Sequence, residues 1–188
     1  MVGKIINKIV RIGLSDDIVY IQPFTVTWKW LFLIEKIRLK FVLDGIIVDI
    51  QHVGSTAIPN MAAKPIIDIC IAIADYKMAI RCAYLIGRLG YEYKGENSLL
   101  RQHYFVKGYP TAYCLYLVEA GNKIIENGVY FRDYLTQHQD VALNYAIFKR
   151  KLANHFPKDR RKYQQAKQSL VQQVINGQIS TQSDDKKV

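Results

Sequence analysis

This sequence has few cysteines and no long apolar run. The first shortage argues against a disulfide-rich protein, and the second argues against a membrane-spanning one. The three cysteines, Cys70, Cys82 and Cys114, form no Cys-x-x-Cys pair and lack metal-ligand spacing with the four histidines. Each lies in an apolar segment, which predicts buried free thiols in a reducing compartment. No apolar stretch reaches the roughly 18 residues that a membrane-spanning helix needs. We therefore expect a soluble, cytoplasmic protein without a disulfide framework or a membrane partner.

Acidic side chains are also scarce. The sequence has 16 Asp and Glu against 26 Lys and Arg, which gives a formal net charge of +10. Such a surplus favours an acidic partner, such as a nucleotide or a nucleic acid, although a basic surface without a particular partner carries the same charge. Hydrophobic residues make up 50% of the 188 residues, which suits one globular domain with a packed core.

Hydrophobic spacing predicts an α+β protein in which a sheet is followed by helices. We expect strands at 18–23, 46–53, 66–73, 91–97, 101–108 and 112–119. We expect helices at 25–43, 75–91, 124–137, 139–155 and 159–175. These elements form one predicted domain over 18–175, with a sheet part at about 18–119 and a helical part at about 124–175. The polar residues 176–188 are predicted to be a disordered tail.

A loop of small and polar residues, 54–65, separates two of the predicted strands. It opens with Gly54, Ser55 and Thr56, whose backbone amides and hydroxyls are able to contact a bound phosphate. Lys64, at the far end, would add a point charge. The same small residues also occur in ordinary turns, so the pattern fits both a phosphate site and a plain connection.

Asp68 lies inside the next predicted strand, among isoleucines. A carboxylate buried in apolar surroundings costs several kcal/mol unless it has a partner. The partner is a divalent metal, Lys64 or the backbone of the loop, and the pattern alone does not choose between them.

Three further polar residues are candidates for the same site. His52 directly precedes the loop and either contacts a ligand as a general base or braces the loop. Arg101 and Lys107 lie on a predicted strand and either face the loop, where they would bind phosphate, or are surface charges.

The segment 148–167 holds eight Lys and Arg against one Asp, so it is either an RNA-binding surface or the solvated face of two helices.

Several segments resemble the GrpB family. HVGSTAIPNMAAKPIIDI at 52–69 is similar to that family's signature. LGYEYKGE at 89–96, HYFVKG at 103–108 and FRDYL at 131–135 resemble further family segments. The resemblance extends over about residues 18–175.

This resemblance implies a nucleotidyltransferase-like mixed sheet flanked by helices. In that fold a Gly-Ser pair follows one strand, and carboxylates on later strands hold two Mg²⁺ ions that align a nucleoside triphosphate with an attacking hydroxyl. Gly54 and Ser55 match the Gly-Ser pair, and Asp68 matches the first carboxylate. The implied cofactors are therefore Mg²⁺ and a nucleoside triphosphate.

The sequence departs from the catalytic pattern at two places. Cys70 stands where the second carboxylate is expected, and a thiol is a poor ligand for Mg²⁺. Cys114 and Tyr116 stand where the family usually has a His-x-His pattern. Glu119, on the same predicted strand, is a candidate third metal ligand or a solvated strand end.

These features together predict a protein that binds a nucleotide or another phosphate-bearing ligand at the Gly54–Asp68 loop, with metal-assisted nucleotidyl transfer as a further step. The alternatives are a non-catalytic binding or accessory module that has lost the second metal carboxylate, and a basic RNA-binding protein.

Overall fold

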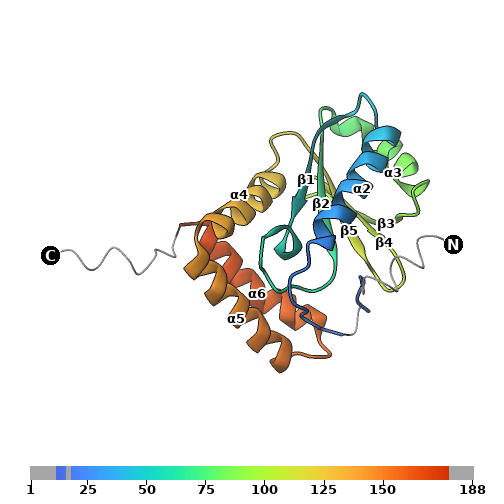
Figure 1. Cartoon of the computed structure of the whole chain (residues 1–188). Helices are drawn as coiled ribbons and strands as arrows, with labels where there is room; N and C mark the ends of the chain where they lie inside the picture. Colours follow the sequence, from blue (N-terminus) through green and yellow to red (C-terminus); the bar gives the residue numbers. More distant parts are fainter. Residues whose placement is uncertain (1–11, 16–17, 178–188) are drawn as a thin grey trace.

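The computed structural model of the chain describes residues 12–15 and 18–177 (Figure 1). The elements follow in the order α2 (Thr27–Val42), β1 (Ile47–Val53), a 3₁₀ turn (Ser55–Ala57), β2 (Ile67–Ile73), a second 3₁₀ turn (Tyr76–Met78) and α3 (Ala79–Gly87). They continue with β3 (Glu92–Asn97), β4 (Gln102–Lys107), β5 (Tyr113–Glu119), α4 (Lys123–Gln137), α5 (Gln139–His155) and α6 (Arg160–Ile175). The described residues thus form an α+β fold with C-terminal helices, as predicted.

The five strands form one mixed sheet in the order β1-β2-β5-β4-β3. The central pair, β2 and β5, is parallel, and the other neighbouring strands are antiparallel. In this register Asp68 lies opposite Cys114, and Cys70 lies opposite Tyr116. The parallel pairing therefore places Cys114 beside Asp68 and Tyr116 beside Cys70.

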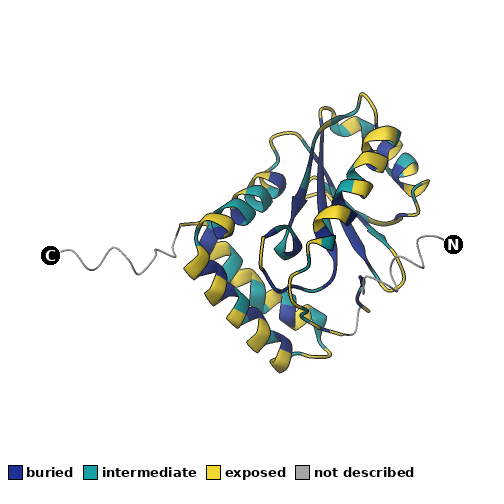
Figure 2. Ribbon diagram, in the orientation of Figure 1, coloured by how far each residue is buried: buried dark blue, intermediate teal, exposed yellow. Residues whose placement is uncertain are grey.

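The two faces of β2 have different surroundings because side chains alternate along a strand. Ile67, Ile69, Ile71 and Ile73 are buried in the largest core cluster, together with side chains of α2 and α3. On the opposite face, Cys70 and its neighbours pack against α4. Helices thus cover the sheet on both sides, and Figure 2 shows the buried sheet between exposed outer helix faces. This double burial explains the continuous apolar run of the strand.

One predicted strand is absent. Residues 18–23 contribute only an isolated bridge between Gln22 and Ala63, not a strand of the sheet. Val19 instead packs against Ala153 and Tyr163 in the helical section, and its amide donates to the carbonyl of Pro157. Packed and exposed side chains alternate in 18–21, as they would in a strand, because one side of this segment packs on the C-terminal helices.

The other predicted elements differ from the structure mainly at their ends. The helix expected at 75–91 is a 3₁₀ turn followed by the shorter α3, whereas the three C-terminal helices lie where they were predicted. Most of the tail predicted to be disordered, 178–188, lies outside the described residues. Among the described helices, none combines the length and apolar character that crossing a bilayer requires.

Candidate functional site

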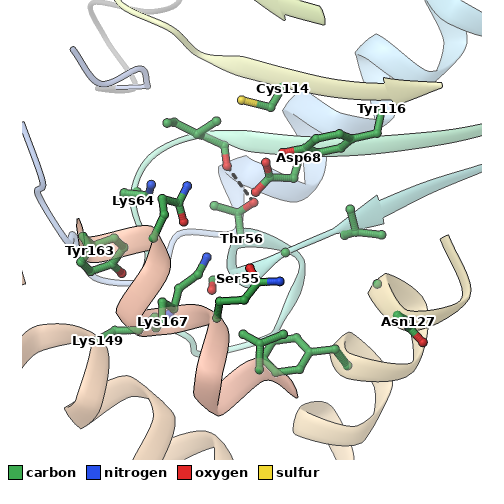
Figure 3. A pocket seen from close by; sticks show the side chains of 18 of the residues that line it. Ser55, Thr56, Lys64, Asp68, Cys114, Tyr116, Asn127, Lys149, Tyr163 and Lys167 are labelled. Atoms are coloured by element: carbon green, nitrogen blue, oxygen red, sulfur yellow. Dashed lines mark hydrogen bonds between the residues drawn. The ribbon is translucent and has the colours of Figure 1, made fainter. Parts of the chain in front are cut away.

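A cavity of about 420 Å³ lies between the sheet and the C-terminal helices, beside the 54–56 loop. Its walls come from the start of β2, from β4 and β5, and from α4, α5 and α6. Figure 3 shows Asp68, Cys114 and Tyr116 on one side of the cavity, with Lys64, Lys149 and Lys167 on the other. Residues far apart in the sequence therefore meet in one place.

Gly54 allows the loop to pass directly over the Asp68 carboxyl. Its φ and ψ are 70° and −175°, a backbone conformation that is accessible essentially to glycine alone. A Cβ built on this residue would lie 2.5 Å from Oδ2 of Asp68. Both observations show that a side chain does not fit here, so the glycine is required by the local geometry.

Thr56 fixes the loop to the strands on either side of it. Its buried hydroxyl donates to the carbonyl of Ile66 over 3.0 Å. Because the hydroxyl hydrogen is used there, the 3.1 Å contact with His52 requires that Nε2 of His52 donates to Thr56. These two hydrogen bonds hold the loop against the sheet.

His52 lies beneath the loop rather than in the cavity wall. Its ring stacks on Phe32 with a centroid distance of 4.7 Å, and the residue is buried. Burial, together with the nearby charge of Arg132, lowers the pKa of the imidazole to about 3. This neutral, hydrogen-bonded ring is placed to brace the loop and does not line the cavity.

Four cationic side chains line the described cavity, against one carboxylate, that of Asp68. The cations are Lys64, Lys149, Arg160 and Lys167. Burial first, and then repulsion by Lys167 and Arg160, lowers the pKa of Lys64 to about 7. Burial and the neighbouring lysines also lower the pKa of Lys149 well below its usual value. The cavity is thus a crowded group of like charges.

Packing and hydrogen bonds hold two of these lysines in place. Nζ of Lys149 donates to the carbonyl of Ala62 over 2.6 Å and lies 4.7 Å from the ring centroid of Tyr145. Nζ of Lys64 lies 5.2 Å from the ring centroid of Tyr163. The positions of these charges are therefore determined by the fold.

On the side of β4 and β5, the cavity wall next to Asp68 consists of the neutral side chains of Tyr104, Cys114 and Tyr116. Tyr104 and Tyr116 stack with a centroid distance of 5.2 Å, and the Tyr104 hydroxyl contacts Sγ of Cys114 over 3.1 Å. Burial raises the pKa of the Cys114 thiol to about 12. Burial also raises the pKa of Asp68, although Lys167, Lys64 and Arg160 oppose this shift.

The donor atoms do not fit a two-Mg²⁺ centre. Cys70, at the place of the second acid, is buried among apolar residues, and burial raises its pKa to about 12. Glu119 pairs with Arg101 over 2.7 Å instead of joining Asp68. Among the residues that the structure describes, no group of three or more His, Cys, Asp or Glu is arranged to hold a metal ion. Asp68 is thus the one carboxylate oxygen donor in this part of the described cavity wall.

Arg101, Lys107 and Glu119, the other candidates from the sequence, have partners outside the described cavity lining. Arg101 stacks on Tyr76, 4.4 Å from its ring centroid, while it pairs with Glu119 at the end of β5. Lys107 pairs with the buried Glu35 of α2 over 2.6 Å. None of the three is among the described residues that line the cavity.

Lys149, Arg160 and Lys167 were not predicted as site residues. They belong to the basic segment 148–167, but the sequence pattern gave no sign that these three point inward. The spacing of Arg160 and Lys167, seven residues apart, places them on one face of α6. Part of the basic charge that suggested RNA binding therefore lines the cavity.

Comparisons with known proteins agree with these observations. The sequence profile described as GrpB protein matches residues 18–176. The chain is 39% identical over 145 residues to the UPF0157 protein YqkA of Bacillus subtilis, covering 77% of this chain and 42% of YqkA. It is 33% identical over 148 residues to the UPF0157 protein BH1888 of Halalkalibacterium halodurans, covering 79% of this chain and 76% of BH1888. The chain thus spans less than half the length of YqkA.

Two solved structures share the fold. The crystal structure of the conserved protein GrpB from Enterococcus faecalis superimposes with a TM-score of 0.76 at 26% identity, covering 85% of this chain and 99% of that one. A structure of the Cid1 poly(U) polymerase bound to MgATP gives a TM-score of 0.50 at 13% identity, covering 80% of this chain and 47% of that one. The likeness to Cid1 shows a nucleotidyltransferase-like fold and nothing more. With the profile match over nearly all of its described residues, this chain belongs to the GrpB family.

Proposed function

We propose that this GrpB-family chain binds a nucleotide, or another small phosphate-bearing molecule, in the cavity beside the Gly54–Asp68 loop. One observation carries the proposal: four cationic side chains from different elements converge there with a single carboxylate. Like charges held this close repel one another, and the lowered pKa of Lys64 reflects that repulsion as well as burial. A bound polyanion would offset the repulsion and form charge-assisted hydrogen bonds.

The size and lining of the cavity support a ligand of nucleotide dimensions. A volume of about 420 Å³ falls within the range of small-molecule sites, roughly 300–1,000 Å³. Aromatic rings, including those of Tyr104, Tyr116 and Phe131, line the same space and would stack on a base. Gly54 and Ser55 border the cavity and would contact phosphate oxygens, while Thr56 would hold the loop in place through its hydrogen bond to Ile66. The Cid1 neighbour, which was solved with MgATP, adds nucleotides to the candidates on grounds of fold alone.

Binding without two-metal transfer is the form of this function that the geometry supports best. Nucleotidyl transfer by two metal ions needs several carboxylates to hold the ions. Asp68 has a neutral thiol, Cys70, in place of its partner, and Glu119 is engaged elsewhere. We therefore favour a binding or accessory module over a metal-assisted transferase.

Calorimetric titration of the full chain with ATP, GTP, CTP and UTP tests the proposal. The variant Lys167→Gln removes one cavity cation, and Arg161→Gln removes an exposed charge of the same helix that does not line the cavity. Loss of a charge-assisted contact costs about 1.5–3 kcal/mol, so we expect Lys167→Gln to weaken binding by about 10- to 100-fold. Arg161→Gln should bind like the wild type.

Two results would overturn this proposal in different ways. If none of the nucleotides nor inorganic triphosphate binds at millimolar concentration, the cavity is not a phosphate site. If the wild type releases pyrophosphate from a nucleotide and Asp68→Asn does not, the chain is a transferase and not a binding module.

A further inference from the structure

The charge of the cavity is opposite to that of a metal-dependent triphosphate site. Sites that use Mg²⁺ collect carboxylates, and the metal then bridges the carboxylates to the phosphate oxygens. Here the described lining has four cationic side chains and one carboxylate. Such a lining attracts phosphate oxygens directly and gives a divalent cation few ligands.

The cations are part of the folded structure. Lys149 is fixed by its hydrogen bond to Ala62, and Lys64 lies against the ring of Tyr163. Lys167 and Arg160 line the same cavity from α6. The amines of Lys64, Lys149 and Lys167 face the same space in Figure 3. Because these side chains are already ordered in the free protein, ligand binding does not have to pay the entropy cost of ordering them. They are therefore able to take the place of a metal ion.

The neighbourhood of Asp68 points the same way. Its strand neighbour on the same face is Cys70, and its partner across the parallel pair is Cys114, both buried neutral thiols. Lys64 and Lys167 act on the carboxyl group as nearby positive charges. The nearest charged neighbours of the Asp68 carboxyl group are therefore basic side chains, whereas a metal site would have a second carboxylate there.

We propose that the cavity binds a molecule that bears a di- or triphosphate in its metal-free, fully charged form. The lysines and the arginine of the cavity would then neutralise the phosphate charge, as Mg²⁺ does in metal-dependent sites. This inference rests on the proposed function. It adds that Mg²⁺ competes with the protein for the ligand, because chelation cancels much of the phosphate charge that the cavity recognises.

The test is calorimetry on the full chain with inorganic triphosphate and with ATP, in EDTA and in excess Mg²⁺, at matched ionic strength. We expect each ligand to bind at least about 10-fold more tightly in EDTA than in excess Mg²⁺. Lys167→Gln should weaken binding in EDTA and reduce the difference between the two conditions. Asp68→Asn should bind at least as tightly as the wild type in EDTA, because it removes the one negative charge of the lining. Arg161→Gln should match the wild type in both conditions.

Tighter binding in Mg²⁺, equal binding in both conditions, or loss of binding in Asp68→Asn would overturn this inference and leave the proposed phosphate site intact. Absence of binding in both conditions would instead overturn the proposed function itself.

Discussion

At Gly54 the main chain passes so close to Asp68 that the methyl group of an alanine would lie 2.5 Å from Oδ2. We predict that Gly54→Ala lowers the free energy of unfolding by about 2–4 kcal/mol, because alanine suffers both the forbidden backbone conformation and the contact with Oδ2. Gly45→Ala is the matched control, since Gly45 also has a φ of 70° but nothing within 4 Å of its Cβ position. It should cost only about 1–2 kcal/mol. Equal losses in urea denaturation would contradict the role assigned to Gly54.

We predict that Lys64 makes binding of the proposed phosphate ligand depend on pH in one direction. The pKa of Lys64 is about 7 in the free protein and would rise beside a bound polyanion. At a pH between the pKa of the free protein and that of the complex, ligand binding is therefore accompanied by uptake of a proton. Affinity should therefore fall as the pH rises from about 7 to about 9, where a phosphate with a pKa near 6 is already ionised. Lys149, with its lowered pKa, and Asp68, with its raised pKa, act in the same direction.

Lys64→Arg separates the contribution of this lysine. Because arginine stays charged throughout this range, the variant should show a shallower pH dependence than the wild type when both are titrated by calorimetry. An affinity that rises with pH in the wild type, or an identical slope in the variant, would be inconsistent with a titrating Lys64.

At the scale of elements, α2 shows how closely burial follows the helical period. Leu39 is fully buried in the main core, whereas Phe41 is 84% exposed. Leu39→Ala should lower the free energy of unfolding by about 2–5 kcal/mol because it leaves a cavity. Phe41→Ala should change it by no more than about 0.5 kcal/mol, because little contact is lost. Thermal denaturation of the two variants measures the contrast, and a large loss for Phe41→Ala would show that this side chain has a contact within the fold.

Sequence reasoning succeeded for elements whose pattern has one structural cause. The strand predicted at 66–73 and the helix predicted at 139–155 are both present. The strand predicted at 18–23 was wrong because the same alternation arises when a non-helical segment covers a helix pair. Local pattern identifies which side chains are buried, but not which partner buries them.

The candidate site was predictable only where it is local in sequence. Gly54, Ser55, Thr56, Lys64 and Asp68 belong to one loop and the strand that follows it, so their proximity follows from chain connectivity. The inward orientation of Lys149, Arg160 and Lys167 depends on how the helical section packs on the sheet, and no short-range pattern encodes that. The partners of Arg101 and Lys107 are likewise distant in sequence: Glu119 at the end of β5 and Glu35 in α2.

For the whole molecule, Arg132 is a principal link between the helical section and the sheet. From α4, its Nη1 donates to Oε1 of Gln51 and to the carbonyl of His52, both over 2.9 Å, at the base of the candidate site. We predict that Arg132→Gln lowers the free energy of unfolding by about 1–3 kcal/mol. Arg150→Gln, at an exposed position of α5, should leave it unchanged within about 0.5 kcal/mol. Chemical denaturation without ligand measures both, and equal stabilities would remove Arg132 from this role.

The two sides of the cavity are not synthesised together. Lys64 and Asp68 leave the ribosome before Lys149, Arg160 and Lys167 do. A nascent chain that has folded only its sheet would hold one positive and one negative side chain at this place, a nearly neutral hollow. The hollow would gain its further positive charges only when α5 and α6 pack against it. A phosphate-bearing molecule would therefore recognise the chain after α5 and α6 have packed and not before.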